Sequence, residues 1–186
     1  YGLGGAPTAV CVSRLVARKG QDSLIGVWPR VVERVPGARL VIVGWGPYAR
    51  RLALLKRRSP VRESIILTGA VPHDELPGHV AMGDVFAMPC RTRGGGLDVE
   101  GLGIVFLEAS ATGLPVIAGT SGGAPETVVE GVTGDVVDGR DQDALVAALV
   151  RQLADPVLRA RMGAAGRALM RERWTWPPLV AGLVRA

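Results

Sequence analysis

The sequence predicts an α/β fold, a Rossmann-like doubly wound parallel sheet of about six strands covered by helices. Short apolar runs alternate with segments of helical length, an order typical of parallel sheets. The run Leu40-Val41-Ile42-Val43 is apolar at every position, as expected for a strand buried on both faces. Glycine-rich segments follow several of these runs, where the chain must turn from strand to helix.

The expected elements follow one another without an internal linker, so residues 1–186 are predicted to form a single domain. The apolar runs predict strands at 9–12, 39–43, 64–67, 85–88, 115–118 and 135–137. Helical patterns predict helices at about 21–35, 48–58, 103–112, 141–153 and 156–172, with short helices starting at Asp74 and after Pro178.

Composition and charge exclude several classes of function. Hydrophobic residues make up 48% of the 186 residues, and no apolar run reaches the roughly 18 residues of a membrane span. The formal net charge of +5 favours anionic partners, but the basic residues are scattered without interleaved aromatics, which argues against nucleic acid. Attraction to an anionic membrane surface stays open. We expect a cytoplasmic protein, either free or peripheral on the inner face of the plasma membrane.

The cysteines and histidines offer neither a disulfide framework nor zinc spacing. Cys11 lies in an apolar strand pattern and is expected to be a core residue. For Cys90 we also favour burial over a reactive thiol.

Two glutamates, Glu100 and Glu108, bracket a glycine-rich turn and the start of a helix. Free backbone amides at a helix start attract anions, whereas carboxylates suit sugar hydroxyls. The arrangement therefore suggests a ligand with hydroxyls at both ends and phosphate between them, as in a nucleotide sugar. Because the neighbours of Glu108 look buried, we expect this carboxylate to contact a ligand and not only solvent.

Two other strand-to-helix loops, and the segment that leads to Glu100, carry further candidate residues. Arg14 and Lys19 follow the first strand and suit phosphate, although an ordinary exposed basic loop has the same composition. The segment from Gly44 to Ala49 matches the dinucleotide fingerprint only weakly, and a tight turn explains its glycines equally well. In the long loop 91–100 the arginines suit a phosphorylated acceptor, but we favour plain solvation.

The spacing Glu100-x7-Glu108 resembles the signature of retaining glycosyltransferases of family 4, in the GT-B superfamily. Ser13-Arg14-Leu15 with Lys19-Gly20 resembles the donor-phosphate loop of that family, and the turn at Gly44 resembles its second-strand turn. The segment 89–103 is very similar to actinobacterial mannosyltransferases, which transfer mannose from GDP-mannose to phosphatidylinositol mannosides.

The resemblance implies a role for each matched position. Arg14 and Lys19 would bind the diphosphate and stabilise the leaving GDP, and Glu100 would bind hydroxyls of the donor sugar; these three form the implied catalytic set. Glu108 would hold the ribose diol. Backbone would supply the remaining donor contacts, near the base at Val71, near the second-strand turn at Gly44, near the sugar at Gly101, Leu102 and Gly103, and near the phosphates at Ile104 and Val105. The implied reaction retains configuration and needs no metal or cofactor.

GT-B enzymes have two Rossmann-like domains, and the resemblance covers only the C-terminal, donor-binding one. We therefore expect a fragment that binds the donor but transfers little alone. The glycolipid acceptor would be bound by a missing N-terminal domain, towards which the helix after Pro178 would pack. Two alternatives stay open: the same fold using a UDP-sugar donor, or a non-catalytic nucleotide-binding module.

Overall fold

The computed structural model describes residues 1–175 and contains one six-stranded sheet in which every pair of neighbouring strands is parallel. The strand order is β3-β2-β1-β4-β5-β6. The predicted fold class is therefore confirmed. The strands are β1 (Thr8–Val12), β2 (Arg39–Val43), β3 (Ile65–Gly69), β4 (Val85–Met88), β5 (Val116–Gly119) and β6 (Gly134–Val137).

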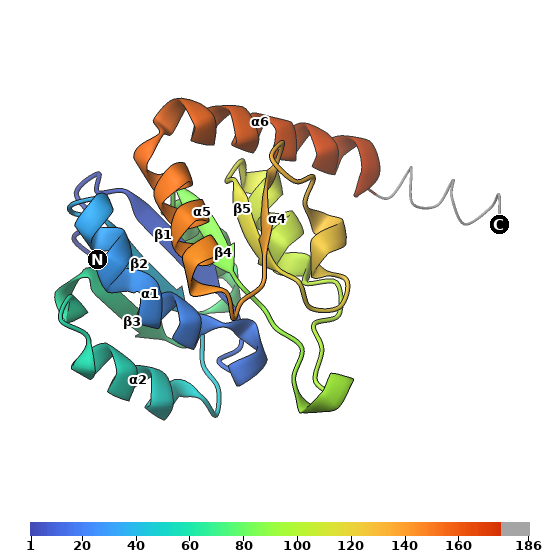
Figure 1. Ribbon diagram of the computed structural model, residues 1–186. Coiled ribbons are helices and arrows are strands. Elements are labelled where there is room, and N and C mark those ends of the chain that lie inside the picture. The colour runs from blue at the N-terminus through green and yellow to red at the C-terminus, as the bar shows by residue number, and fades with distance from the viewer. Residues whose placement is uncertain (176–186) are drawn as a thin grey trace.

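Six α-helices cover the sheet in the described part of the chain. On one face α1 packs against α2 and α5, whereas α3 and α4 pack together on the other, and α6 contacts both α4 and α5 (Figure 1). The helix predicted after Pro178 lies outside the described residues. The helix bounds are α1 (Gln21–Arg34), α2 (Ala49–Arg58), α3 (Leu76–Ala81), α4 (Ile104–Thr112), α5 (Gln142–Ala154) and α6 (Pro156–Arg173).

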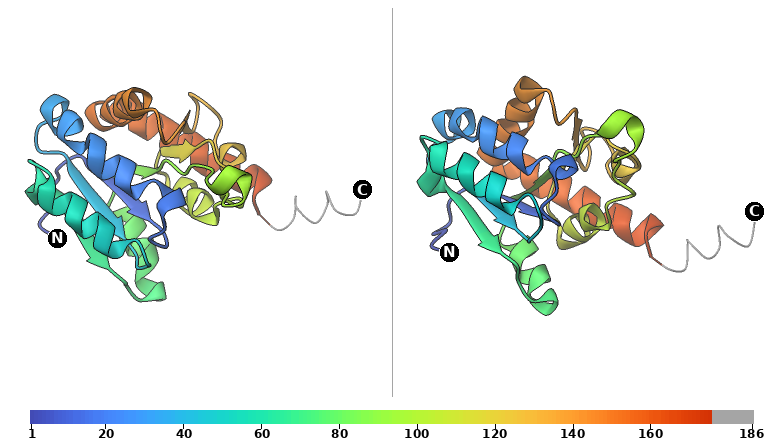
Figure 2. Two further views of the ribbon diagram at one scale, coloured as in Figure 1. Left: turned by 60° about the horizontal axis from the view of Figure 1, so that its bottom comes forward. Right: turned by 90° about the horizontal axis from the view of Figure 1, so that it is seen from below.

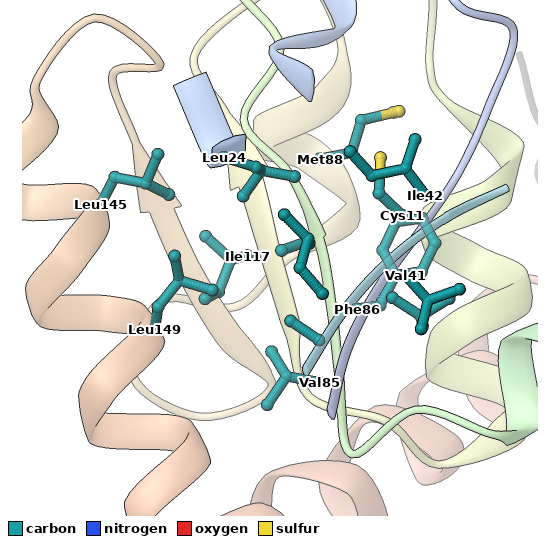
Figure 3. Packing of buried hydrophobic residues seen from close by; sticks show 14 of the residues in the cluster. Cys11, Leu24, Val41, Ile42, Val85, Phe86, Met88, Ile117, Leu145 and Leu149 are labelled. Atoms are coloured by element: carbon teal, nitrogen blue, oxygen red, sulfur yellow. The ribbon is translucent and has the colours of Figure 1, made fainter. Parts of the chain in front are cut away.

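The core lies on both sides of the sheet. Every residue of β1, β4 and β5 is buried, as expected for central strands of a doubly wound sheet. Leu145 and Leu149 from α5 approach Ile117 of β5 (Figure 3). This packing fixes the sheet as a rigid platform from which the connecting loops project.

The loops after the six strands all emerge at one edge, because parallel strands place their carboxyl ends together. The order along the sheet reverses between β1 and β4, and ligands of open α/β sheets bind at such a switch point. The loop after β4 carries a 3-10 turn at Gly94–Gly96 that projects from the body of the domain (Figures 1 and 2). The sequence did not predict this turn, since a single turn has no hydrophobic periodicity.

Within residues 1–175, no helix is both long enough and apolar enough to cross a membrane.

Candidate functional site

A hollow of about 350 Å³ opens at the carboxyl edge beside the switch point. It gathers five of the predicted site residues from four separate loops or helices, which are Arg14, Gly44, Val71, Val105 and Glu108. Residues to which the sequence analysis gave no role complete its wall: Val12, Ser13, Val43, Trp45, Ala70 and Leu76.

The loops after β1 and β2 interlock to form one side of this hollow. The amide of Leu15 donates to the carbonyl of Trp45 at 3.0 Å, and the amide of Ser13 donates to the carbonyl of Val43 at 3.1 Å. Gly44 has φ +135°, and a Cβ there would collide with the Ser13 carbonyl. Glycine is therefore required for these two loops to approach each other. Trp45 lines the rim of the hollow and is 70% exposed. Its position as the second residue after a buried strand is the sequence feature that could have identified it.

Helix α4 forms another side through Val105 and Glu108, whereas Ile104 and the turn before it do not line the hollow. Gly103 caps the helix with φ +77° and no side-chain cap, so the first amides of the helix face outward. The Gly123 amide donates to the Gly101 carbonyl at 2.7 Å and holds the preceding turn, in which Leu102 is half-buried. Ile104 at the first helical position is 66% exposed. The Phe106 ring packs edge-on against Phe86 of β4, with centroids 5.8 Å apart, which anchors the helix to the sheet.

Glu108 lies in the middle of α4 and lines the hollow, but the expectation that its neighbours are buried was wrong in part. Glu108 and Ile104 are exposed, Val105 and Leu107 are half-buried, and only Phe106 turns into the core. The sequence could not show which side of this helix faces solvent, because almost every residue in the run is apolar and no polar face alternates with an apolar one. Glu108 therefore has access to a ligand without a buried, unpaired charge.

Lys19 and Glu100 do not line this hollow and instead form an ion pair with each other. Lys19 Nζ is 2.7 Å from Glu100 Oε2, and the two side chains are only 11% and 6% exposed. The 3-10 turn Ala17–Lys19 points the lysine inward. Ser121 Oγ accepts a hydrogen bond of 3.0 Å from the Glu100 amide and fixes the backbone there. The structure thus brings two predicted site residues into direct contact with each other.

Arg91 belongs to an internal network and is not a solvated loop residue, contrary to expectation. Its guanidinium donates to Asp22 at 2.6 Å and to Ser23 at 2.7 Å, and the Tyr48 hydroxyl donates to the same Asp22 carboxylate at 3.1 Å. Burial, followed by the nearby Asp22 charge, raises the pKa of Tyr48. Arg91 therefore ties the loop after β4 to α1, while Arg93 on the same loop is exposed.

The two cysteines are core residues, as predicted. Both are fully buried. Burial raises the pKa of Cys11 to about 12 and also raises the pKa of Cys90.

One Asp-x-Asp sequence occurs, at Asp141-Gln142-Asp143, and both carboxylates have structural partners. Asp141 caps α5 by accepting from the amides of Asp143 and Ala144, and Asp143 pairs with Arg30 at 2.6 Å. Among residues 1–175 there is no group of three or more His, Cys, Asp or Glu side chains placed to hold a metal ion.

A larger hollow of about 560 Å³ lies between α4 and α6, away from the strand ends. Its lining includes the predicted site residues Ile104 and Glu108, but none of the basic residues of the loop after β1. Volume alone is a poor guide here. The smaller hollow is the better candidate because it sits at the switch point and collects the predicted polar groups.

Residues 3–169 match the family of glycosyl transferases group 1. The chain is 58% identical over 176 residues to the GDP-mannose-dependent alpha-(1-6)-phosphatidylinositol monomannoside mannosyltransferase of Mycolicibacterium smegmatis, a match that covers 95% of this chain and 46% of that protein. It is 54% identical over 170 residues to the GDP-mannose-dependent monoacylated alpha-(1-6)-phosphatidylinositol monomannoside mannosyltransferase of Corynebacterium glutamicum, covering 91% of this chain and 44% of the relative.

Among solved structures, sucrose-phosphate synthase of Thermosynechococcus elongatus superposes with a TM-score of 0.83 at 28% identity, over 97% of this chain and 45% of that one. The chain spans about half the length of the curated relatives that it matches.

Proposed function

Because this chain belongs to the group 1 glycosyl transferases, we propose that it is the donor-binding domain of a mannosyltransferase that uses GDP-mannose. The acceptor proposed for the whole enzyme is a lipid of the phosphatidylinositol mannoside type, by analogy with the relatives. The single observation that carries donor binding is the meeting of Arg14, Gly44, Val71, Val105 and Glu108 in one hollow.

The hollow suits a nucleoside diphosphate in one orientation. Val71 offers an apolar wall for the base, and the Glu108 carboxylate can accept both hydroxyls of the ribose. The diphosphate then meets the outward amides of Ile104 and Val105 and the cation of Arg14. The sugar points towards Glu100 and the turn at 101–103.

The proposed chemistry is stabilisation of the leaving GDP. Charge grows on the diphosphate as the bond to the sugar breaks. Arg14 and the α4 amides would offset this charge, together with Lys19 once it turns from Glu100 towards the diphosphate. Groups arranged in advance in this way are commonly worth about 3 kcal/mol each in a transition state. Retention of configuration and the absence of a metal requirement are part of this proposal, supported by the resemblance to family 4.

The acceptor half of the site is proposed to come from outside these residues, since the relatives are about twice as long as this chain. We therefore expect donor binding and little transfer by residues 1–186 alone. The net charge of +5 supports attachment to an anionic membrane surface on the cytoplasmic side.

The decisive measurement is titration calorimetry of the chain with GDP, UDP and ADP. We expect GDP to bind at least about tenfold more tightly than UDP, since a site built for one base leaves polar groups unpaired with another. GDP-mannose is then compared with GDP-glucose to test the sugar. If UDP binds as well as GDP, the proposal fails in favour of a UDP-sugar transferase. If none of the nucleotides binds, donor binding itself is wrong.

A further inference from the structure

Arg18 lies next to the Lys19–Glu100 pair and has no role in the proposed function. Its Nη1 is 3.3 Å from Asp98 Oδ1, its Nε is 3.8 Å from Glu100 Oε2, and its carbonyl accepts a hydrogen bond of 2.8 Å from the Arg91 amide. The side chain is 27% exposed. Arg18 is therefore anchored at its backbone and at one guanidinium nitrogen.

The Nε atom of Arg18 is a spare donor. It is buried and makes no hydrogen bond within the described chain. The nearest carboxylate oxygen, Glu100 Oε2, also lacks a hydrogen-bond partner among residues 1–175. Lys19 forms an ion pair with this oxygen, but without aligned hydrogen-bond geometry. A shortening of about 1 Å would turn the 3.8 Å separation into a charge-assisted hydrogen bond.

Charge balance gives this spare contact a purpose. Lys19 and Arg18 together offset Glu100 and Asp98, so the cluster is neutral without a ligand. If Lys19 turns to an incoming diphosphate, Glu100 stays buried at 6% exposure and loses its closest cation. An uncompensated buried charge is strongly destabilising. Among the described residues only Arg18 and Lys19 have a cationic nitrogen within 4.0 Å of Glu100.

We propose that Arg18 is a positioning residue that takes over Glu100 when Lys19 engages the donor diphosphate. It keeps the carboxylate paired with a cation and aimed at the sugar, and it holds the segment 98–100 against the loop after β1. This inference rests on the proposed function, because it assumes that Lys19 binds the diphosphate and Glu100 the sugar. It predicts that Arg18 matters for the sugar more than for the nucleotide.

The test compares GDP with GDP-mannose by calorimetry on the 186-residue chain. The quantity of interest is the sugar ratio, defined as the Kd for GDP divided by the Kd for GDP-mannose. In Arg18→Gln we expect this ratio to fall about tenfold, the usual worth of a hydrogen bond to a charged group, while the Kd for GDP changes less than about threefold. Arg18→Lys keeps the charge but cannot serve both carboxylates, so we expect a loss of about threefold.

A double-mutant cycle with Glu100→Gln separates positioning from a merely structural effect. In the Glu100→Gln background neither Arg18 variant should lower the sugar ratio further, because the group on which Arg18 acts is gone. Arg30→Gln serves as a matched control, since it removes an arginine of a solvent-exposed ion pair with Asp143. Thermal unfolding of each variant checks folding, and the Arg18→Lys arm decides the matter if Arg18→Gln does not fold.

The possible outcomes are distinct. If the unmodified chain binds neither GDP nor GDP-mannose, the proposed function itself is wrong, and the inference about Arg18 falls with it. If that chain binds both ligands but the Arg18 variants leave the sugar ratio unchanged, the inference is overturned. An equal loss for GDP and GDP-mannose would instead show that Arg18 contacts the diphosphate directly. A loss that persists in the Glu100→Gln background would also contradict positioning.

Discussion

Glu108 illustrates how one side chain can be well placed for a ligand while contributing little to the fold. It is exposed on α4, and no ion pair ties it to another described residue. Its value lies in the hollow that it lines together with Arg14 and Val71. A free carboxylate at this position can accept two hydroxyls of a ribose without first breaking an internal contact.

Replacing Glu108 with alanine should therefore weaken GDP binding by about tenfold or more, because hydrogen bonds to a charged group are lost. The same change should leave the affinity for a dideoxy analogue of GDP, which lacks the ribose diol, close to that of the unmodified chain. Titration calorimetry with both ligands measures the difference.

Glu172→Ala is the matched control for that experiment, since Glu172 is also an exposed helical glutamate but does not line the hollow. If Glu108→Ala weakens the binding of GDP and of its dideoxy analogue equally, the proposal that Glu108 binds the ribose hydroxyls is wrong.

Among the elements, α4 connects the fold to the site most directly. Its first residues carry the amides that are proposed to meet the diphosphate, and Phe106 anchors it to β4. Gly103 makes this arrangement possible, because the residue sits at φ +77° and a Cβ there would approach the Phe106 ring to 2.6 Å. A side chain at this position would have to displace either the ring or the turn.

Gly103→Ala should destabilise the domain by about 1–3 kcal/mol, the usual cost of a strained backbone position. It should also weaken GDP binding, because the displaced turn carries the amides that face the phosphates. Urea unfolding and calorimetry measure the two effects separately.

Asp141→Ala provides the comparison at a helix start remote from the hollow. Asp141 caps α5 through the amides of Asp143 and Ala144, so its loss should cost about 1 kcal/mol of stability. The affinity for GDP should not change. Gly103→Ala binding GDP as tightly as Asp141→Ala would mean that the α4 amides do not face the phosphates.

At the scale of the whole molecule, the sheet seals both cysteines in a single core. Cys11 lies in β1, and Cys90 lies two residues after the end of β4, the neighbour of β1 in the sheet. With its pKa raised to about 12, the Cys11 thiol is almost fully protonated at neutral pH, and it is also inaccessible.

We expect neither thiol to react with a chromogenic aromatic disulfide at about pH 8 until the domain unfolds. Only the thiolate reacts, and an ordinary exposed thiol, with a pKa of about 8.5, is partly ionised at this pH, whereas the buried thiols are not. The labelling rate should follow the unfolded fraction as urea is added. Rapid labelling of one thiol in the folded chain would show that the core opens locally.

The raised pKa of Cys11 also predicts a dependence of stability on pH. The unfolded thiol ionises at lower pH than the folded one, so unfolding releases a proton and stability falls as the pH rises from about 9 to 12. Cys11→Ala should remove this contribution, which urea unfolding at several pH values would detect as a shallower slope.

The local pattern of apolar residues was sufficient to predict the order of strands and helices. Burial of one or both faces of an element gives its apolar residues a spacing that distinguishes strands from helices. The bounds of β2 and β4 were predicted to the residue, and the other described strands and α-helices lie within about two residues of expectation, whereas the 3-10 turn at Gly94–Gly96 was not predicted. Since successive strands separated by helices run parallel, the sequence also implied that the loops carrying Arg14, Gly44 and Glu100 share one edge.

Contacts between distant residues depended on how the strands are ordered. β1 lies beside β4, and this places Lys19 against Glu100, Arg18 against Asp98, and Asp22 against Arg91, each pair roughly 70–80 residues apart. No local pattern encodes such a pairing, because strand order and loop path set the distance. The sequence could therefore suggest which charged residues are candidates for binding a ligand, whereas only the tertiary structure shows which of these residues form ion pairs with each other.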